Sequence, residues 1–178
     1  PTNDLTFEKY PASSSLVNFY VTRSATDSLF IFAAGNNGKS NPAAEALFPK
    51  LYPRAEKGWI SVVGIDPKTR LIDAESNRAG DAKNWTIAAN YVVTVDKITG
   101  AAVYTTTAYG TSFAAPVIAG AAGAIQLKYP WMSRDLIKQS LLTTAVDLGD
   151  PGVDAVYGWG LLNLEKAMKG PAVFDTRL

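Results

Sequence analysis

The chain has 178 residues, of which 47% are hydrophobic and 19% charged, a balance typical of one globular domain with a sizeable core. Its 17 basic and 16 acidic residues leave a net charge of +1, so charge gives no reason to expect a nucleic acid or an anionic membrane as partner. Cysteine and histidine are both absent, which excludes disulfides, thiol chemistry and an imidazole base supplied by this chain.

The first half of the chain predicts two buried strands. Ser14 or Ser15 is placed to cap a short helix over residues 16–25, although a strand also fits the spacing there. Two apolar runs, residues 29–34 and residues 59–65, predict fully buried parallel strands, and the first run stops at a Gly-Asn-Asn-Gly turn. The proline-bearing segment over residues 38–58 predicts a loop with little regular structure.

The second half adds further strands and then helices. We expect a short strand over residues 71–74, longer strands over residues 85–89, 91–95 and 101–106, and a turn at residues 97–100. The uncharged residues 113–125 predict a helix that is apolar all round and therefore buried, and this run is too short to cross a bilayer. Ser133 predicts the start of a helix that ends near residue 144, and a last short helix follows over residues 164–168. The alternation of strands and helices predicts an α/β fold with a mainly parallel sheet.

Ser112 stands at the start of the apolar helix and is the first candidate catalytic residue. The unpaired N–H groups and the positive end of the helix dipole would stabilise an oxyanion formed when this hydroxyl attacks an acyl carbon. The alternative is that Ser112 only caps the helix, because serine is among the best N-cap residues. Asn36 follows the strand at residues 29–34, so both residues are expected beyond the carboxyl ends of strands, where α/β sheets carry their sites.

Three motifs resemble those of the subtilisin-like serine endopeptidases, and they occur in that family's order. The nucleophile motif is matched by GTSFAAP at residues 110–116, and the strand end with the oxyanion-hole asparagine by AAGNNG at residues 33–38. The Gly-x-Gly turn before the last helix is matched by YGWGLLN at residues 157–163. The resemblance covers about residues 25–170, and SNRAG at residues 76–80 further resembles the passenger domains of bacterial autotransporters.

The resemblance implies a role for each site residue. Ser112 would be the nucleophile, and the Asn36 side chain and the backbone N–H of Ser112 would donate to the oxyanion. The substrate-binding residues that it implies are Ala33, Ala34, Gly35 and Thr111. The family's fold places helices on both faces of the sheet. No cofactor is predicted, and whether the parent protein binds calcium stays open.

The catalytic triad is the point at which the chain departs from the family. The triad runs Asp, His, Ser along the sequence, and only the Ser is present here. We therefore expect residues 1–178 to be the C-terminal part of one subtilisin-like domain, inactive alone, with the Asp and His before Pro1. The expected partners are a protein or peptide substrate and the missing N-terminal part of the same domain, in a secreted or cell-surface protein. Strands left unpaired at that boundary would favour association of the isolated piece.

Two alternative functions stay open. Sedolisins share the fold and use Glu in place of His as the base, which fits a chain without histidine, but their oxyanion residue is an Asp where this chain has Asn36. The other alternative is a non-catalytic domain that keeps the fold and binds a peptide or a partner. Such a module has no need of both Ser112 and an oxyanion donor.

Overall fold

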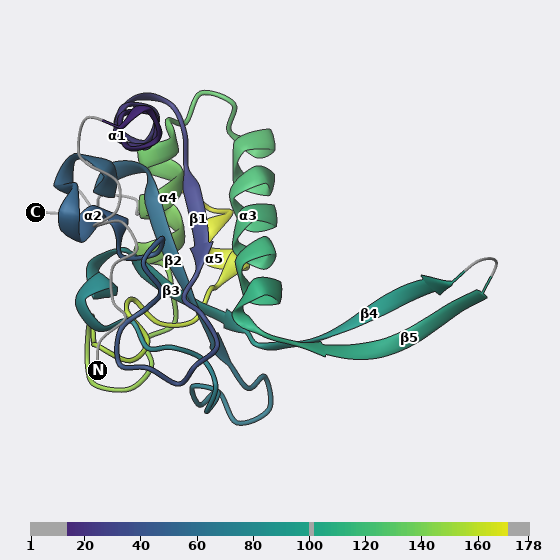
Figure 1. Ribbon diagram of the computed structural model, residues 1–178. Coiled ribbons are helices and arrows are strands. Elements are labelled where there is room, and N and C mark those ends of the chain that lie inside the picture. The colour runs from purple at the N-terminus through teal and green to yellow at the C-terminus, as the bar shows by residue number, and fades with distance from the viewer. Residues whose placement is uncertain (1–13, 100–101, 171–178) are drawn as a thin grey trace, which may run out of the picture.

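A computed structural model describes residues 14–99 and 102–170 as a parallel sheet with helices on both faces and a long hairpin that projects from one end (Figure 1). The strands β1, β2 and β3 lie in that order and are all parallel, whereas β4 and β5 form a separate antiparallel pair. The predicted α/β fold with a parallel sheet is confirmed. The elements in chain order are α1 (Ser15–Thr26), β1 (Phe30–Ala33), α2 (Phe48–Leu51), the 3₁₀ helix η2 (Pro53–Gly58), β2 (Trp59–Ile65), the 3₁₀ helix η3 (Gly80–Trp85), β3 (Thr86–Asn90), β4 (Val92–Thr99), β5 (Ala102–Tyr109), α3 (Thr111–Lys128), α4 (Arg134–Thr143) and α5 (Leu164–Ala167).

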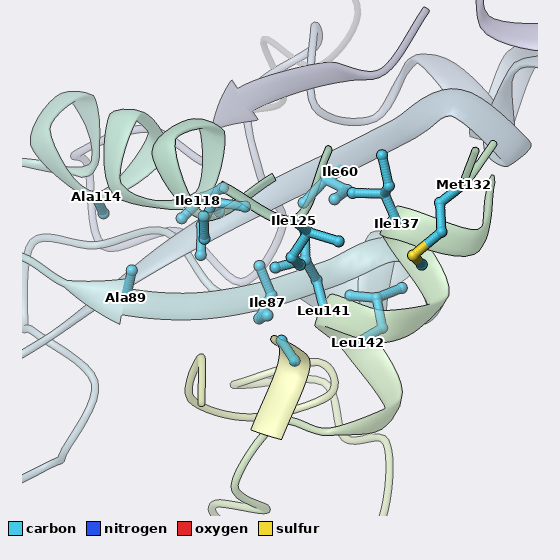
Figure 2. Close-up of a cluster of buried hydrophobic side chains, with 13 residues drawn as sticks. Ile60, Ile87, Ala89, Ala114, Ile118, Ile125, Met132, Ile137, Leu141 and Leu142 are labelled. Atoms are coloured by element: carbon cyan, nitrogen blue, oxygen red, sulfur yellow. The ribbon is translucent and has the colours of Figure 1, made fainter. Parts of the chain in front are cut away.

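The central strand β2 separates two hydrophobic clusters. All seven of its residues are buried, as expected for a parallel strand covered on both faces. On one face, Ile60 and Ile87 pack against Ile118 and Ile125 of α3, and residues of α4 extend this cluster (Figure 2). On the other face, the Trp59 ring belongs to a cluster with residues of α1 and α2. The position of α3 relative to the sheet is therefore set by packing along its length.

Serine side chains begin two of the helices, as the sequence predicts. Ser14 accepts a hydrogen bond of 3.2 Å from the backbone N–H of Val17 at the start of α1, which settles that segment as a helix. Ser133 accepts one of 3.3 Å from Leu136 N at the start of α4. Each hydroxyl satisfies a backbone donor that the first turn of a helix leaves unpaired.

Several predicted elements differ in the structure. The strand β1 is only half-buried, because it lies at an edge of the described sheet with β2 as its partner. The segment predicted as a loop contains α2 and η2, whose first turns each hold a proline where no backbone N–H is needed. The predicted strand at residues 71–74 is reduced to a single bridge between Ile65 and Ile72. The strand β4 continues through Thr99 where a turn was expected from residue 97, and residue 100 lies outside the described residues.

The helix α3 is not buried on all sides, so that prediction is wrong. Its sheet-facing side is buried, but Val117 is 42% exposed and Leu127 is 84% exposed on the other side. Apart from the chain neighbours and the nearby backbone of the helix itself, no described atom lies within 4 Å of the place that a Cβ would take at Gly120 or Gly123. An apolar helix face is therefore left uncovered within residues 14–99 and 102–170. No helix in those residues is both long enough and apolar enough to cross a membrane.

The burial of Lys138 in α4 leads to a prediction of how the free energy of unfolding depends on pH. Its side chain is 7% exposed and donates to the carbonyl oxygen of Glu56, and burial lowers the pKa of its ammonium group to about 8. Between pH 8 and 10.5 the unfolded chain therefore holds a proton that the folded chain has lost, so the free energy of unfolding rises with pH in that window, by up to about 3 kcal/mol. We expect the Tm of the protein to rise from pH 8 to 10.5 relative to that of Lys138→Met. If the Tm of both proteins changed equally with pH, the result would contradict this prediction. Lys83→Met, at an exposed position, is the control and should follow the unmodified protein.

Candidate active site

The end of β1 and the start of α3 are joined by hydrogen bonds between Asn36 and Thr111. The Thr111 backbone N–H donates to Asn36 Oδ1 over 2.9 Å, and the Thr111 hydroxyl donates to the same oxygen over 2.8 Å. The hydroxyl in turn accepts a bond of 3.2 Å from Gly35 N. These contacts bring together residues about 75 positions apart in the sequence. They place Asn36 beside the N-terminus of α3, next to Ser112.

The same contacts decide which way the Asn36 amide points. A backbone N–H can only donate, so the atom that it meets must be the side-chain oxygen and not the nitrogen. Both bonds from Thr111 end on Oδ1, and within the described residues the Nδ2 group donates no hydrogen bond. The side chain is exposed. Asn36 thus presents a free, oriented N–H donor next to the helix.

Ser112 lies in the first turn of α3 and does not cap it. The N-cap residue is Gly110, which has no side chain, so the interpretation of Ser112 as a mere cap is wrong. Within residues 14–99 and 102–170, neither its hydroxyl nor its backbone N–H has a hydrogen-bond partner. The residue is exposed, whereas the neighbouring Thr111 is fully buried. Ser112 therefore offers an open hydroxyl and an unpaired N–H at the positive end of a helix dipole.

Gly110 keeps a space open between the two donors. It has a φ of +133°, a backbone conformation that other residues rarely adopt. A Cβ at this position would lie 3.3 Å from Asn36 Nδ2 and 3.8 Å from Ser112 N. The point that a side chain would occupy is thus close to both N–H groups. The lack of a side chain at Gly110 therefore leaves the space beside both N–H groups open.

Ser112 follows a different element from the one expected. It comes after the antiparallel hairpin of β4 and β5, not after a strand of the parallel sheet. Only Asn36 follows a strand of that sheet directly. The site therefore combines the carboxyl end of one sheet strand with the N-terminus of a helix that the hairpin leads into.

The residues expected to bind substrate differ in their exposure. Ala33 and Gly35 are partly exposed, whereas Ala34 and Thr111 are fully buried. The Ala34 carbonyl accepts hydrogen bonds from Ala43 N over 2.7 Å and from the Asn77 side chain over 2.9 Å. The side chains of Ala34 and Thr111 therefore build the turn that carries Asn36 and face no open surface.

Asn77 is a supporting residue to which the sequence analysis gave no role, although it lies in the SNRAG motif at residues 76–80. It is 2% exposed, and its Oδ1 accepts from the backbone N–H groups of Asn37 over 3.1 Å and Lys39 over 2.9 Å. Its Nδ2 donates to Ala34, so one amide closes the turn on both sides of Asn36. In the sequence, Asn77 stands outside any predicted helix or strand. An asparagine in such a segment does not by itself show that its side chain is buried. Only the fold brings residue 77 under residues 34–39.

The described residues contain no histidine base and no cluster of metal ligands that could activate this serine. The chain has no histidine, and no group of three potential metal ligands occurs in the described ranges. A cavity of about 390 Å³ lies elsewhere, between η2 and α4, and its lining includes Lys138 and Trp159 but neither Asn36 nor Ser112. The arrangement offers an exposed hydroxyl and two N–H groups that have no partner among the described residues, without a histidine beside them.

Comparison with known proteins identifies the family. The profile of the subtilase family matches residues 3–160. The chain belongs to the subtilase family. Serotype-specific antigen 1 of Mannheimia haemolytica is 40% identical over 154 residues, which are 84% of this chain and 16% of that protein. The Neisserial autotransporter lipoprotein NalP of Neisseria meningitidis serogroup B is 40% identical over 159 residues, 82% of this chain and 14% of that protein.

A solved subtilase structure confirms the fold. The structure of the patellamide maturation protease PatA matches with a TM-score of 0.69 at 23% identity, over 88% of this chain and 56% of that chain. At this identity the likeness speaks for the fold alone. The chain thus spans about a sixth of the length of the two relatives and about half of the PatA chain.

Substitution of Asn77 tests whether its side chain stabilises the turn that carries Asn36. Asn77→Leu removes the acceptor of two backbone N–H groups and leaves the Ala34 carbonyl one donor short, and each buried polar group without a partner costs about 1–3 kcal/mol. We expect the free energy of unfolding to fall by about 2–5 kcal/mol in denaturant titration. Asn84→Leu, at an exposed position, is the matched control and should change it by less than about 0.5 kcal/mol. An equal effect of both substitutions would contradict the supporting role of Asn77.

Proposed function

We propose that residues 1–178 are the C-terminal part of one subtilisin-like peptidase domain and that the parent protein is a serine endopeptidase. In this proposal the Ser112 hydroxyl attacks the carbonyl carbon of a peptide bond and forms an acyl-enzyme. The oxyanion of the tetrahedral intermediate receives hydrogen bonds from Asn36 Nδ2 and Ser112 N. A histidine before Pro1 takes the serine proton, and an aspartate there orients that histidine.

The observation that carries this proposal is the orientation of the Asn36 amide. Two bonds from Thr111 hold its oxygen, so its N–H group is left free beside the unpaired N–H of Ser112. A donor fixed before the reaction needs no reorganisation when charge develops, which is why such groups stabilise transition states strongly. Thr111 is a positioning residue in this scheme, because it acts through Asn36.

The proposed boundary with the preceding part of the domain is the edge of β1 together with the exposed face of α3. Strand β1 is half-buried and pairs with β2 alone among the described strands. The α3 face carries Phe113, Val117 and Leu127 at helical spacing, all at least one-third exposed. An open strand edge beside an uncovered apolar helix favours an additional strand and its connecting chain as the missing cover.

The alternatives receive less support. A sedolisin-type site has a carboxyl in the place where this chain has the Asn36 amide. A purely binding domain gives no reason for a free Asn36 N–H, an unpaired Ser112 N–H and a glycine that keeps the space between them open. The autotransporter relative and the antigen support the proposal that the parent protein is secreted or at the cell surface.

Labelling of the parent protein with a fluorophosphonate probe tests the catalytic proposal. We expect Ser112 of the parent to be labelled, and no label on residues 1–178 expressed alone. Ser112→Ala should abolish labelling and peptidase activity. Asn36→Ala should lower kcat about 10²–10³-fold with little change in KM, a magnitude measured for the corresponding donor of a subtilisin, a member of the same family. Asn84→Ala is the control for asparagine substitution, and a parent protein that takes no label at Ser112 would be a binding domain.

Association of the chain with its preceding part tests the proposed boundary. Residues 1–178 expressed alone should form oligomers or aggregates in sedimentation velocity, and co-expression with the preceding part should give a defined complex. Val117→Asp should weaken that complex more than tenfold, because it buries an unpaired carboxylate in an apolar contact. Leu71→Asp changes a side chain that is 62% exposed on a loop and should leave the complex intact. A monodisperse monomer of 19.0 kDa would argue against an open boundary.

A further inference from the structure

The hairpin of β4 and β5 projects from the body directly beside the site. Figure 1 shows its distal end clear of the other described elements. Eight cross-strand pairs hold it together, from Val92 opposite Tyr109 to Thr99 opposite Ala102. Eight residues in an antiparallel strand extend over about 27 Å. The hairpin is therefore an arm whose base is three residues from Ser112.

Both faces of this arm expose large apolar side chains. Ile98 and Val103 are cross-strand partners, so they share one face, and they are 74% and 62% exposed. Tyr104 is the next residue along β5, so it lies on the opposite face, and it is 60% exposed. A two-stranded ribbon of this kind is only marginally stable in water without a partner. Its composition points to a contact made during function.

The edges of the arm are also open. Each of its strands pairs only with the other, so the outer edge of each keeps a row of backbone N–H and C=O groups without strand partners in the described part of the chain. Such an edge accepts an extended polypeptide as an additional strand. The side chains of the hairpin can then contact alternate residues of that polypeptide.

The charge of the arm argues for an unfolded polypeptide as its occupant. Its two strands carry one acid and one base, Asp96 and Lys97, and three consecutive exposed threonines, residues 105–107. Asp96 accepts a hydrogen bond of 3.0 Å from the Thr105 hydroxyl across the ribbon. A surface without net charge attracts neither nucleic acid nor an anionic membrane. The interactions left for binding a partner are backbone hydrogen bonds and apolar contacts, and an extended peptide can make both.

We propose that the hairpin binds the substrate polypeptide on the C-terminal side of the scissile bond by strand addition. This inference rests on the proposed peptidase function and adds a substrate-binding surface to it. The family resemblance implies that the turn at residues 33–35 binds substrate; in this proposal that turn takes the residues before the scissile bond, and the arm that ends at Tyr109 takes the residues after it. Its length matches about eight residues of an extended substrate.

A shortened hairpin tests the proposal in the full-length protein. Residues 96–105 are replaced by Asn-Gly, which joins the directly paired Val95 and Thr106 through a two-residue turn. Two substrates share the same residues before the scissile bond. One ends in a chromogenic leaving group immediately after the bond, and the other continues for eight residues.

We expect kcat/KM of the short substrate to stay within twofold, and that of the long substrate to fall at least tenfold, mainly through KM. Equal losses on both substrates, or no loss on the long one, would overturn the proposal. If the unmodified protein cleaves neither substrate, the peptidase function itself fails, which is a distinct result.

A triple substitution separates side-chain contacts from the fold of the hairpin. Ile98→Thr, Val103→Thr and Tyr104→Thr together remove the exposed apolar groups but keep residues that favour strands. We expect a loss of about threefold or more on the long substrate alone. Leu71→Thr is the matched control at another exposed apolar position, and an equal loss with this control would contradict a specific role for the arm.

Discussion

The structure of the site depends on two hydrogen bonds that end on a single oxygen, Asn36 Oδ1. They come from the backbone and the hydroxyl of Thr111, so the first residue of α3 is fixed to the loop that follows β1. Because the oxygen is occupied on this side, the amide nitrogen faces the opposite way. The direction of the donor and its separation from the helix N-terminus are thus consequences of one contact.

That contact keeps its geometry only because the structural elements on both sides of it are held in place. The helix α3 is held against the sheet by Ile118 and Ile125, which pack on residues of β2 and β3 (Figure 2). The loop is held by Asn77, whose amide satisfies backbone groups on both sides of Asn36. A core on one side and a buried polar side chain on the other therefore hold the start of α3 and the loop with Asn36 in place, which is what the proposed preorganised donors require.

Much of this arrangement could be predicted from local sequence. Apolar runs and serine caps give β2, α1 and α4 close to their observed positions, because strand burial and helix capping are determined within a few residues. The burial of Asn77 and the open face of α3 could not be predicted, since both depend on which distant segments lie nearby. The role of Thr111 was also missed, because a buried threonine bonded to a neighbouring loop has the same local sequence as one that faces a ligand. The pattern of apolar residues alone cannot distinguish a helix that is buried on all sides from one that has an exposed apolar face.

The separation of the catalytic groups along the polypeptide has a consequence for control. In the proposed peptidase, the nucleophile and the oxyanion donors lie in the described part of the chain, whereas the acid–base pair lies outside it. Under this proposal neither portion can hydrolyse a peptide bond until both have folded together, because each lacks groups that the reaction needs. Completion of the domain across the open edge of β1 and the exposed face of α3 would then be the step that makes the proposed peptidase active.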